Sequence, residues 1–174
     1  MISRRNLLTS LVAAAITGGL GRTAETMAAQ ERRLPWRNWS GSQTCLPSAR
    51  MAPATVDELQ ALLASTTGPV RPVGAGHSFS ALVPTEGTLV SLSRLSGLID
   101  HDTASQQATL WAGTRLGDIG QPLEAVGQAL INMPDIDEQS LAGSLATATH
   151  GTGATIGCMS DFIIGLELLD ARGE

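Results

Sequence analysis

Apolar residues recur with helical spacing in two stretches of the chain. In the first stretch they stand three or four positions apart, at Val56, Leu59, Leu62 and Leu63. Thr55 precedes this stripe and Glu58 follows three residues later, which is the spacing of a capping box. Gly68 and Pro69 are typical helix-ending residues. The pattern therefore predicts a helix that begins after Thr55 and ends before Gly68.

A second stripe with the same spacing predicts another helix, which Gly127 closes. Its members are Leu116, Ile119, Leu123 and Val126. Between the two helices, short apolar or alternating runs predict strands at residues 70–73, 89–92, 98–102 and 108–112. The last two runs flank a polar tip at residues 103–107, so they indicate a hairpin in which His101 is a solvated surface residue.

The two ends of the remaining chain give less regular patterns. Residues 30–53 are polar and interrupted by Pro47, so we expect an irregular lead-in with one short strand. Residues 162–170 are apolar and predict a buried strand, and residues 170–174 have the composition of a hairpin turn. A turn with no returning strand leaves a sheet edge unpaired. We therefore favour a truncated product or a fragment over a frayed C-terminus.

The first 29 residues have the composition of an export signal. Arg4 and Arg5 precede an apolar run at residues 7–20, which is too short to span a bilayer because about 20 apolar residues are needed. Small residues, Ala28 and Ala29, follow this run, as in a secretory signal. The order Ser-Arg-Arg-Asn-Leu-Leu resembles the twin-arginine signal. We expect a signal at residues 1–29, a mature domain at 30–174, and a periplasmic or extracellular location. The alternative is an uncleaved anchor helix.

Composition removes several classes of function. All 11 basic residues are Arg, and a P-loop requires a Lys against the phosphates, so that kind of nucleotide hydrolysis is excluded. A net charge of −5 and 3% aromatic residues argue against nucleic acid as a partner. The three His residues and two Cys residues give no zinc spacing, and we expect Cys45 and Cys158 to be free thiols.

A glycine-rich loop at residues 73–80, here the first glycine loop, follows the strand predicted at residues 70–73. Gly74 and Gly76 allow backbone N–H groups to approach an anion and form a nest for phosphate oxygens. The loop is not the dinucleotide fingerprint, because Phe79 stands where the third Gly belongs. It also lacks the Gly-x-Ser-x-Gly spacing of a nucleophile elbow. Taken alone, a histidine in such a loop is more often a plain turn residue than a functional one, and this is the first interpretation of His77.

The second glycine loop, residues 134–153, has small residues at almost every position. Its hydroxyl groups belong to Ser140, Ser144, Thr147 and Thr149. Two interpretations are open at this point. Either a flat, bulky ligand lies against this backbone, or the segment is a tightly packed helix start.

The two loops, with Trp39, Ser40 and Gly41 upstream, resemble a known flavoprotein family. It is the vanillyl-alcohol oxidase and p-cresol methylhydroxylase family, and the motifs most resemble its sugar-1,4-lactone oxidases and alditol oxidases. The resemblance covers roughly residues 36–174. It implies an α+β fold, namely the PCMH-type FAD-binding domain of two small sheet-and-helix subdomains, here incomplete at its C-terminus.

The resemblance implies FAD as the cofactor, with the first glycine loop around its pyrophosphate and His77 joined covalently to the flavin ring methyl. The cofactor-binding residues that it implies are Val73, Gly74, Ala75, Gly76, His77, Ser78, Ser140, Gly143, Ser144, Thr147, His150 and Gly151. It assigns no catalytic residue to this chain, because those of the family lie in a cap domain that follows.

The activity that the resemblance implies is oxidation of an alcohol carbon. Hydride would pass from a sugar-1,4-lactone or polyol to the flavin, and dioxygen or another electron acceptor would reoxidise the flavin. The twin-arginine route exports folded proteins, which suits a chain that takes up FAD before it meets the membrane in transit. The alternative is a truncated flavin-binding remnant that catalyses nothing, and we expect the 174-residue chain alone to be inactive.

Overall fold

The structure is a computed structural model that describes residues 33–174, of which Leu34–Glu174 form one unit. The signal segment expected at residues 1–29 lies outside the described residues. No described helix is long and apolar enough to cross a membrane.

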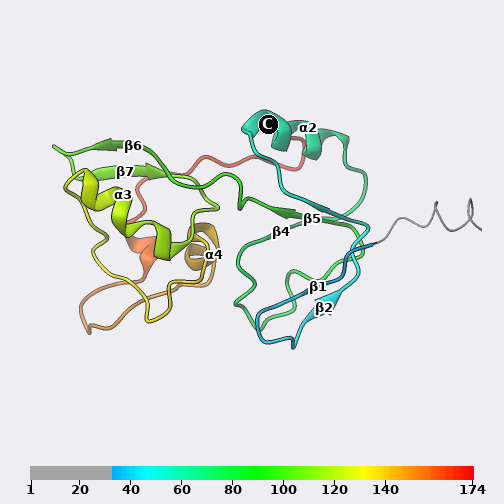
Figure 1. The fold of residues 1–174 in the computed structure, drawn as a ribbon, viewed down its shortest axis with the longest axis horizontal. Coiled ribbons are helices and arrows are strands. Elements are labelled where there is room, and N and C mark those ends of the chain that lie inside the picture. The colour runs from blue at the N-terminus through cyan, green and yellow to red at the C-terminus, as the bar shows by residue number, and fades with distance from the viewer. Residues whose placement is uncertain (1–32) are drawn as a thin grey trace, which may run out of the picture. The chain divides into compact units, whose positions relative to one another are not determined.

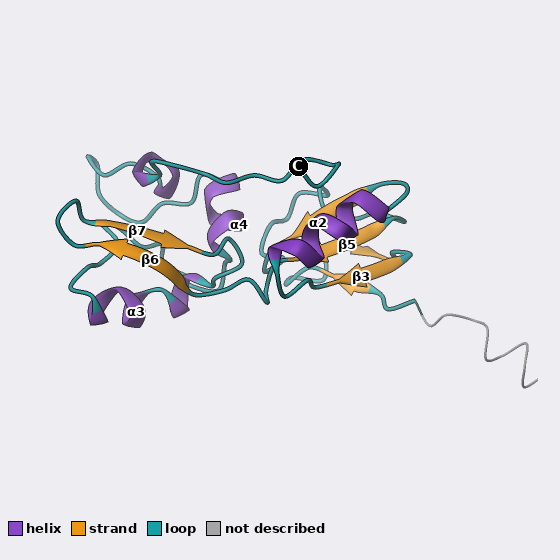
Figure 2. Ribbon diagram, turned by 90° about the horizontal axis from the view of Figure 1, so that it is seen from above, coloured by secondary structure: helices purple, strands orange, loops and turns teal. Residues whose placement is uncertain are grey.

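A three-stranded parallel sheet forms the N-terminal part of this unit (Figure 1). Its strands are β3 (Ala49–Met51), β5 (Thr88–Ser91) and β4 (Val70–Val73), with β5 in the middle. The central strand is the most buried, because Leu89 and Val90 are only 1% and 3% exposed. Helix α2 (Val56–Ser65) connects β3 to β4 and lies along the sheet in Figure 2.

The start of α2 is the one that the sequence predicts. The Thr55 hydroxyl accepts a hydrogen bond from the backbone N–H of Glu58 at 3.1 Å. The Glu58 carboxylate in turn accepts from the backbone N–H of Ala54 at 2.7 Å. These bonds satisfy backbone donors that the first helical turn leaves without partners.

The lead-in contains more strand than expected. Two of its strands, β1 (Trp36–Arg37) and β2 (Thr44–Cys45), pair antiparallel, and β3 joins the parallel sheet. The expectation of one short strand was wrong, because runs of two or three residues are too short to show an alternating pattern.

The rest of the unit is built on a β-hairpin and short helices. Strands β6 (Leu98–Asp102) and β7 (Gln107–Leu110) pair antiparallel, as predicted, and His101 is exposed on β6. The second predicted helix is present as a 3₁₀ turn at Leu116–Asp118 followed by α3 (Gly120–Ala125). After it come α4 (Leu141–Ala146) and a 3₁₀ turn at Met159–Phe162. Their shared core consists of Leu116, Ile119, Leu123, Leu141 and Met159.

The strand predicted at residues 162–170 is wrong. Beyond the 3₁₀ turn that ends at Phe162, these residues form neither helix nor strand. Ile164, Leu166 and Leu168 are 77%, 70% and 78% exposed. A strand needs a neighbour to satisfy its backbone, and the described residues place none beside this segment. The expected turn after it does form, since the N–H of Gly173 donates to the carbonyl of Asp170 at 3.0 Å.

Candidate functional site

The first glycine loop leaves the end of β4 and is fastened to the turn between β1 and β2. Gly76 adopts a left-handed backbone conformation with φ of +74°, which glycine reaches without strain. Its carbonyl accepts a hydrogen bond from the N–H of Trp39 at 2.9 Å. The side chain of Asn38, only 3% exposed, donates to the carbonyl of Ser78 at 3.1 Å. These bonds fix the path of the loop.

Successive backbone N–H groups of this loop have no acceptor among the described residues, and among them are those of Ala75, Gly76, His77 and Ser78. Unpaired backbone donors are uncommon in folded proteins unless water or a ligand meets them. Successive N–H groups of a glycine-rich turn form a concave site for an anion. The loop is therefore suited to a phosphate or pyrophosphate group.

The two glycine loops approach each other at Gly74. A Cβ atom added to Gly74 would collide with the hydroxyl oxygen of Ser140, and it would lie 3.8 Å from the Cα of Gly143. Ser140 begins α4, where its hydroxyl accepts a hydrogen bond from the N–H of Gly143 at 3.3 Å. The first glycine loop thus passes so close to the start of α4 that a side chain at Gly74 does not fit.

The first backbone donors of α4 are already used within the protein. The N–H of Leu141 donates to the carbonyl of Thr114 at 2.7 Å, and that of Ala142 donates to the carbonyl of Ala112 at 3.0 Å. With the N–H of Gly143 bound to the Ser140 hydroxyl, α4 offers no free donor in this turn. The donors for an anion therefore come from the first glycine loop.

The predicted hydroxyl groups of α4 differ in their accessibility. Ser144 is fully buried, and its hydroxyl donates to the carbonyl of Leu141 at 2.7 Å. Thr147 is exposed at the end of α4 and donates to the carbonyl of Gly143 at 3.0 Å. Its hydroxyl also lies 3.2 Å from that of Thr149, and Thr147 is the more exposed of the two residues.

Gly151 packs against a different turn. A Cβ atom on Gly151 would collide with the carbonyl oxygen of Met133 and the side-chain oxygen of Asn132. The exposed His150 places its Nδ1 2.9 Å from the carbonyl of Gly151. Gly151 therefore contacts the turn at Asn132 and Met133, whereas Ser140 and Gly143 are the residues that meet the first glycine loop.

His77 lies in an aromatic cluster that sequence reasoning missed. Its imidazole stacks on the indole of Trp39, with ring centroids 5.3 Å apart and planes at 20°. Phe79 meets the same indole edge-on, with centroids 6.3 Å apart. Trp39 and Phe79 are 66% and 65% exposed. The adjacent pair Asn38 and Trp39 before the first glycine loop was the available signal, because both residues contact this loop.

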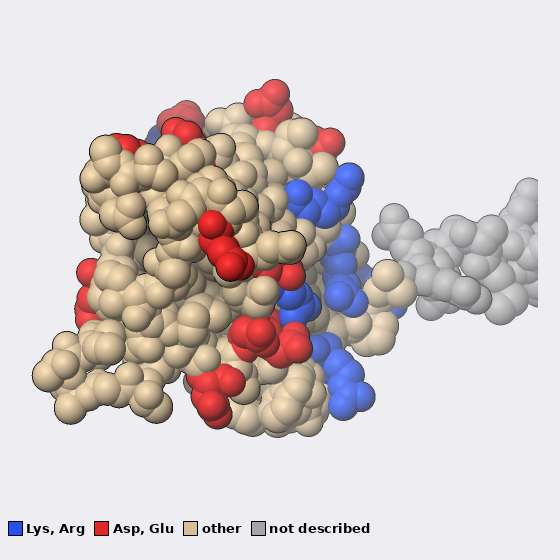
Figure 3. Space-filling view, turned by 60° about the vertical axis from the view of Figure 1, so that its left-hand side comes forward, with Lys and Arg blue, Asp and Glu red and all other residues tan. Residues whose placement is uncertain are grey.

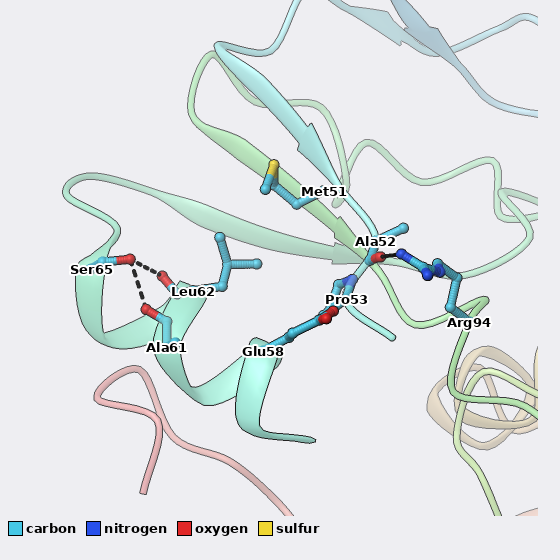
Figure 4. A pocket seen from close by; sticks show the side chains of 8 residues that line it. All are labelled: Met51, Ala52, Pro53, Glu58, Ala61, Leu62, Ser65 and Arg94. Carbon is cyan, nitrogen blue, oxygen red and sulfur yellow. Dashed lines mark hydrogen bonds between the residues drawn. The ribbon is translucent and has the colours of Figure 1, made fainter. Parts of the chain in front are cut away.

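A separate cavity of about 460 Å³ lies between α2 and the end of β3 (Figure 4). The polar groups around it are satisfied inside the protein. Arg94 donates to the carbonyl of Ala52 at 3.3 Å, and the Ser65 hydroxyl donates to the carbonyl of Ala61 at 2.7 Å. Apart from Glu58, Ser65 and Arg94 the residues that line this cavity are apolar, so it is not the candidate site.

Charged groups elsewhere in the described residues form no second candidate. In Figure 3 arginine side chains gather along one side of the visible face, and acidic side chains are spread over the remainder. Arg115 pairs with Glu138 at 2.8 Å, and both side chains are solvent-exposed. The described residues contain no group of three or more His, Cys, Asp or Glu side chains placed to hold a metal. Cys45 and Cys158 are free thiols.

Residues 47–174 match the profile of a family described as "FAD binding domain". The chain belongs to this FAD-binding domain family. The first glycine loop and α4 both lie inside the matched range.

Curated relatives of this FAD-binding domain include several lactone-oxidising enzymes. It is 37% identical over 142 residues to an L-gulono-1,4-lactone dehydrogenase of Mycobacterium tuberculosis, covering 80% of this chain and 33% of that protein. It is 33% identical over 150 residues to a D-arabinono-1,4-lactone oxidase of Eremothecium gossypii, covering 82% and 28%. The chain thus spans about a third or less of the length of these relatives.

Solved structures confirm the PCMH-type fold. Cholesterol oxidase from B. sterolicum superposes with a TM-score of 0.57 at 23% identity, covering 67% of this chain and 24% of that one. An alkyldihydroxyacetonephosphate synthase superposes with a TM-score of 0.59 at 18% identity, covering 66% and 24%. The α+β class expected from the sequence is therefore correct.

Proposed function

We propose that the chain binds FAD with the pyrophosphate held by the first glycine loop. The observation that carries this proposal is the run of unpaired backbone N–H groups from Ala75 to Ser78. These donors can meet phosphate oxygens without any side chain, which suits a domain that has no Lys. Membership of the FAD-binding domain family supports the same ligand.

The residues beside this loop fit a bulky cofactor. Gly74 and Gly143 keep the backbone at the start of α4 free of side chains, and the Thr147 hydroxyl is exposed at the other end of that helix. We propose that Ser140 and Gly143 shape the wall of the FAD site, with Thr147 donating to or accepting from the cofactor. Val73 would support this wall from the end of β4. Ser144, His150 and Gly151 would act by holding the surrounding backbone.

We further propose that His77 is the point of covalent attachment. An imidazole nitrogen of His77 would bond to the flavin ring methyl carbon, which gives up one hydrogen while the imidazole gives up its N–H proton. The two protons and two electrons released would reduce dioxygen to hydrogen peroxide. The position of His77 within the loop supports this role, since no hydrogen bond to a described residue occupies either ring nitrogen.

The reaction that we propose for the enzyme is oxidation of a sugar-1,4-lactone or a polyol. When bound, FAD supplies the acceptor of the hydride, and dioxygen or another electron acceptor takes the electrons onward. The names of the relatives from Mycobacterium tuberculosis and Eremothecium gossypii support a lactone substrate. We also propose export to the periplasm or outside the cell, on the basis of the two arginines and the apolar run in residues 1–29. FAD binding without turnover is the alternative function.

Titration of the 174-residue chain with flavins tests this proposal. FAD should bind at least about tenfold more tightly than riboflavin, because riboflavin has no pyrophosphate for the amide donors of the loop. Equal affinity for the two flavins would contradict the placement of the pyrophosphate. After acid denaturation, flavin should stay on the unmutated polypeptide and be lost from His77→Ala. Flavin that is fully extractable from the unmutated chain would refute covalent attachment alone.

Peroxide release and dye reduction separate catalysis from binding without turnover. FAD-loaded protein is supplied with gulono-1,4-lactone, arabinono-1,4-lactone, xylitol or sorbitol. Peroxide in excess of bound flavin indicates an oxidase, and dye reduction without peroxide indicates a dehydrogenase. Absence of both, in protein that retains FAD, supports the alternative.

A further inference from the structure

We propose that Trp39 is the positioning residue for His77, and that its indole sets the plane of the imidazole for bond formation. This inference rests on the proposed attachment of FAD at His77. The geometry that points to it is the stack between the two rings, with centroids 5.3 Å apart and planes inclined by only 20°.

The stack is what restrains the imidazole of His77. Among the described residues, no hydrogen bond reaches its Nδ1 or Nε2, and the residue is half-buried. A ring without hydrogen bonds turns freely about its last torsion unless packing holds it. Trp39 covers one face of the imidazole, and both ring nitrogens are without a hydrogen-bond partner among the described residues.

The plane of the ring matters because the nucleophilic lone pair of an imidazole nitrogen lies in that plane. Holding the plane therefore fixes the direction from which His77 can attack a carbon. Orienting a reacting group in this way accelerates a reaction without new chemistry. We therefore expect Trp39 to affect the rate at which His77 attaches to the flavin and not the affinity for FAD.

The backbone of Trp39 is fixed to the first glycine loop. Its backbone N–H donates to the carbonyl of Gly76 at 2.9 Å, so Trp39 is joined to the loop that carries His77. The preceding residue, Asn38, is 3% exposed and accepts a hydrogen bond from the N–H of Gln43 at 2.9 Å. Trp39 as a residue is 66% exposed, so replacement of its indole leaves no cavity in a core.

Three variants test the inference in the 174-residue chain, each loaded with FAD after purification as apoprotein. Trp39→Leu removes the aromatic face, Trp39→Phe keeps a smaller one, and Phe79→Leu removes the other exposed ring of the cluster as a matched control. The attached fraction is followed over time by acid precipitation, and the initial affinity is measured by quenching of flavin fluorescence.

We expect attachment to slow about three- to tenfold in Trp39→Leu, in line with the strength of stacked aromatic pairs. Trp39→Phe should restore most of the rate, Phe79→Leu should match the unmutated chain, and the affinity for FAD should change less than about twofold in all three. An unchanged rate in Trp39→Leu would overturn the inference. A loss of FAD affinity equal to the loss of rate would also overturn it, because Trp39 would then be a binding residue.

Proton NMR of the apoprotein checks the stack without any flavin. The ring protons of His77 should lie upfield of those of His101 and His150, and Trp39→Leu should remove this difference. If the upfield shift is present but the unmutated chain never attaches flavin, the attachment under Proposed function fails and the positioning role fails with it. If attachment occurs and no upfield shift is found, the positioning role alone is refuted.

Discussion

Gly74→Ala should destabilise the fold by forcing apart the two glycine loops. The added Cβ atom collides with the hydroxyl oxygen of Ser140, whereas the next atoms, the Cβ of Ser140 and the Cα of Gly143, lie at 3.6 and 3.8 Å, which are ordinary contact distances. The backbone of Gly74 has no positive φ, so alanine suits the conformation itself. The cost therefore comes from a single oxygen atom.

Two responses relieve this collision, and both are costly. If the Ser140 side chain rotates away, α4 loses the hydroxyl that accepts from the N–H of Gly143, at about 1 kcal/mol. If the backbone moves, overpacking costs about 1–3 kcal/mol. We therefore expect Gly74→Ala to lower the free energy of unfolding by about 1–3 kcal/mol.

Urea unfolding followed by circular dichroism measures this change, and a double-mutant cycle with Ser140→Ala tests its cause. Without the Ser140 oxygen, Gly74→Ala should cost less than about 0.5 kcal/mol. Gly120→Ala is the matched control, because a Cβ atom there meets nothing within 4 Å and alanine favours a helix. Additive costs for Gly74→Ala and Ser140→Ala would refute the collision.

Three further changes have expected outcomes. Thr55→Ala removes the hydroxyl that caps α2 and should cost about 1 kcal/mol of unfolding free energy in urea, whereas no loss would contradict the cap. Thr147→Val should weaken FAD retention by about 1 kcal/mol, and Ser80→Ala should leave the ratio of flavin to protein absorbance unchanged. The pKa of Asp170 is lowered by hydrogen bonds to its carboxylate, and the bond from the backbone N–H of Glu174 has the largest effect. The C-terminal turn should therefore persist above the ordinary pKa and loosen as pH falls through the lowered one. A protection factor against exchange of the Glu174 amide that is constant between about pH 5 and pH 2 would contradict this.

The sequence predicts those elements whose determinants are local. Helix α2 is predicted because its cap at Thr55 and its apolar stripe lie within one short stretch. Strands β4 and β6 likewise coincide with short runs that turn residues delimit. The segment at residues 162–170 has the right composition for a strand, yet pairing requires a neighbouring strand, which composition does not report.

In the candidate site too, the sequence predicts some features and not others. The glycines of the two loops indicate an anion site from the sequence alone, because a glycine allows the backbone to approach a ligand closely. The close approach of Gly74 to Ser140 and the stack of Trp39 on His77 bring together residues that are far apart in the chain. A single sequence contains no local pattern that pairs such residues. Burial of Ser144 was equally hidden, because a hydroxyl on a small-residue helix can face either way.

The claim that the first glycine loop holds the FAD pyrophosphate is tested most directly by amide NMR of the isotope-labelled chain. On addition of FAD, the N–H signals of residues 75–78 should move and exchange more slowly with solvent, because each donor gains an acceptor. Riboflavin at the same concentration should not slow the solvent exchange of these four N–H groups, because it brings no phosphate acceptor. FAD-induced changes that are confined to other residues, with the signals of Ala75, Gly76, His77 and Ser78 unmoved, would contradict the claim.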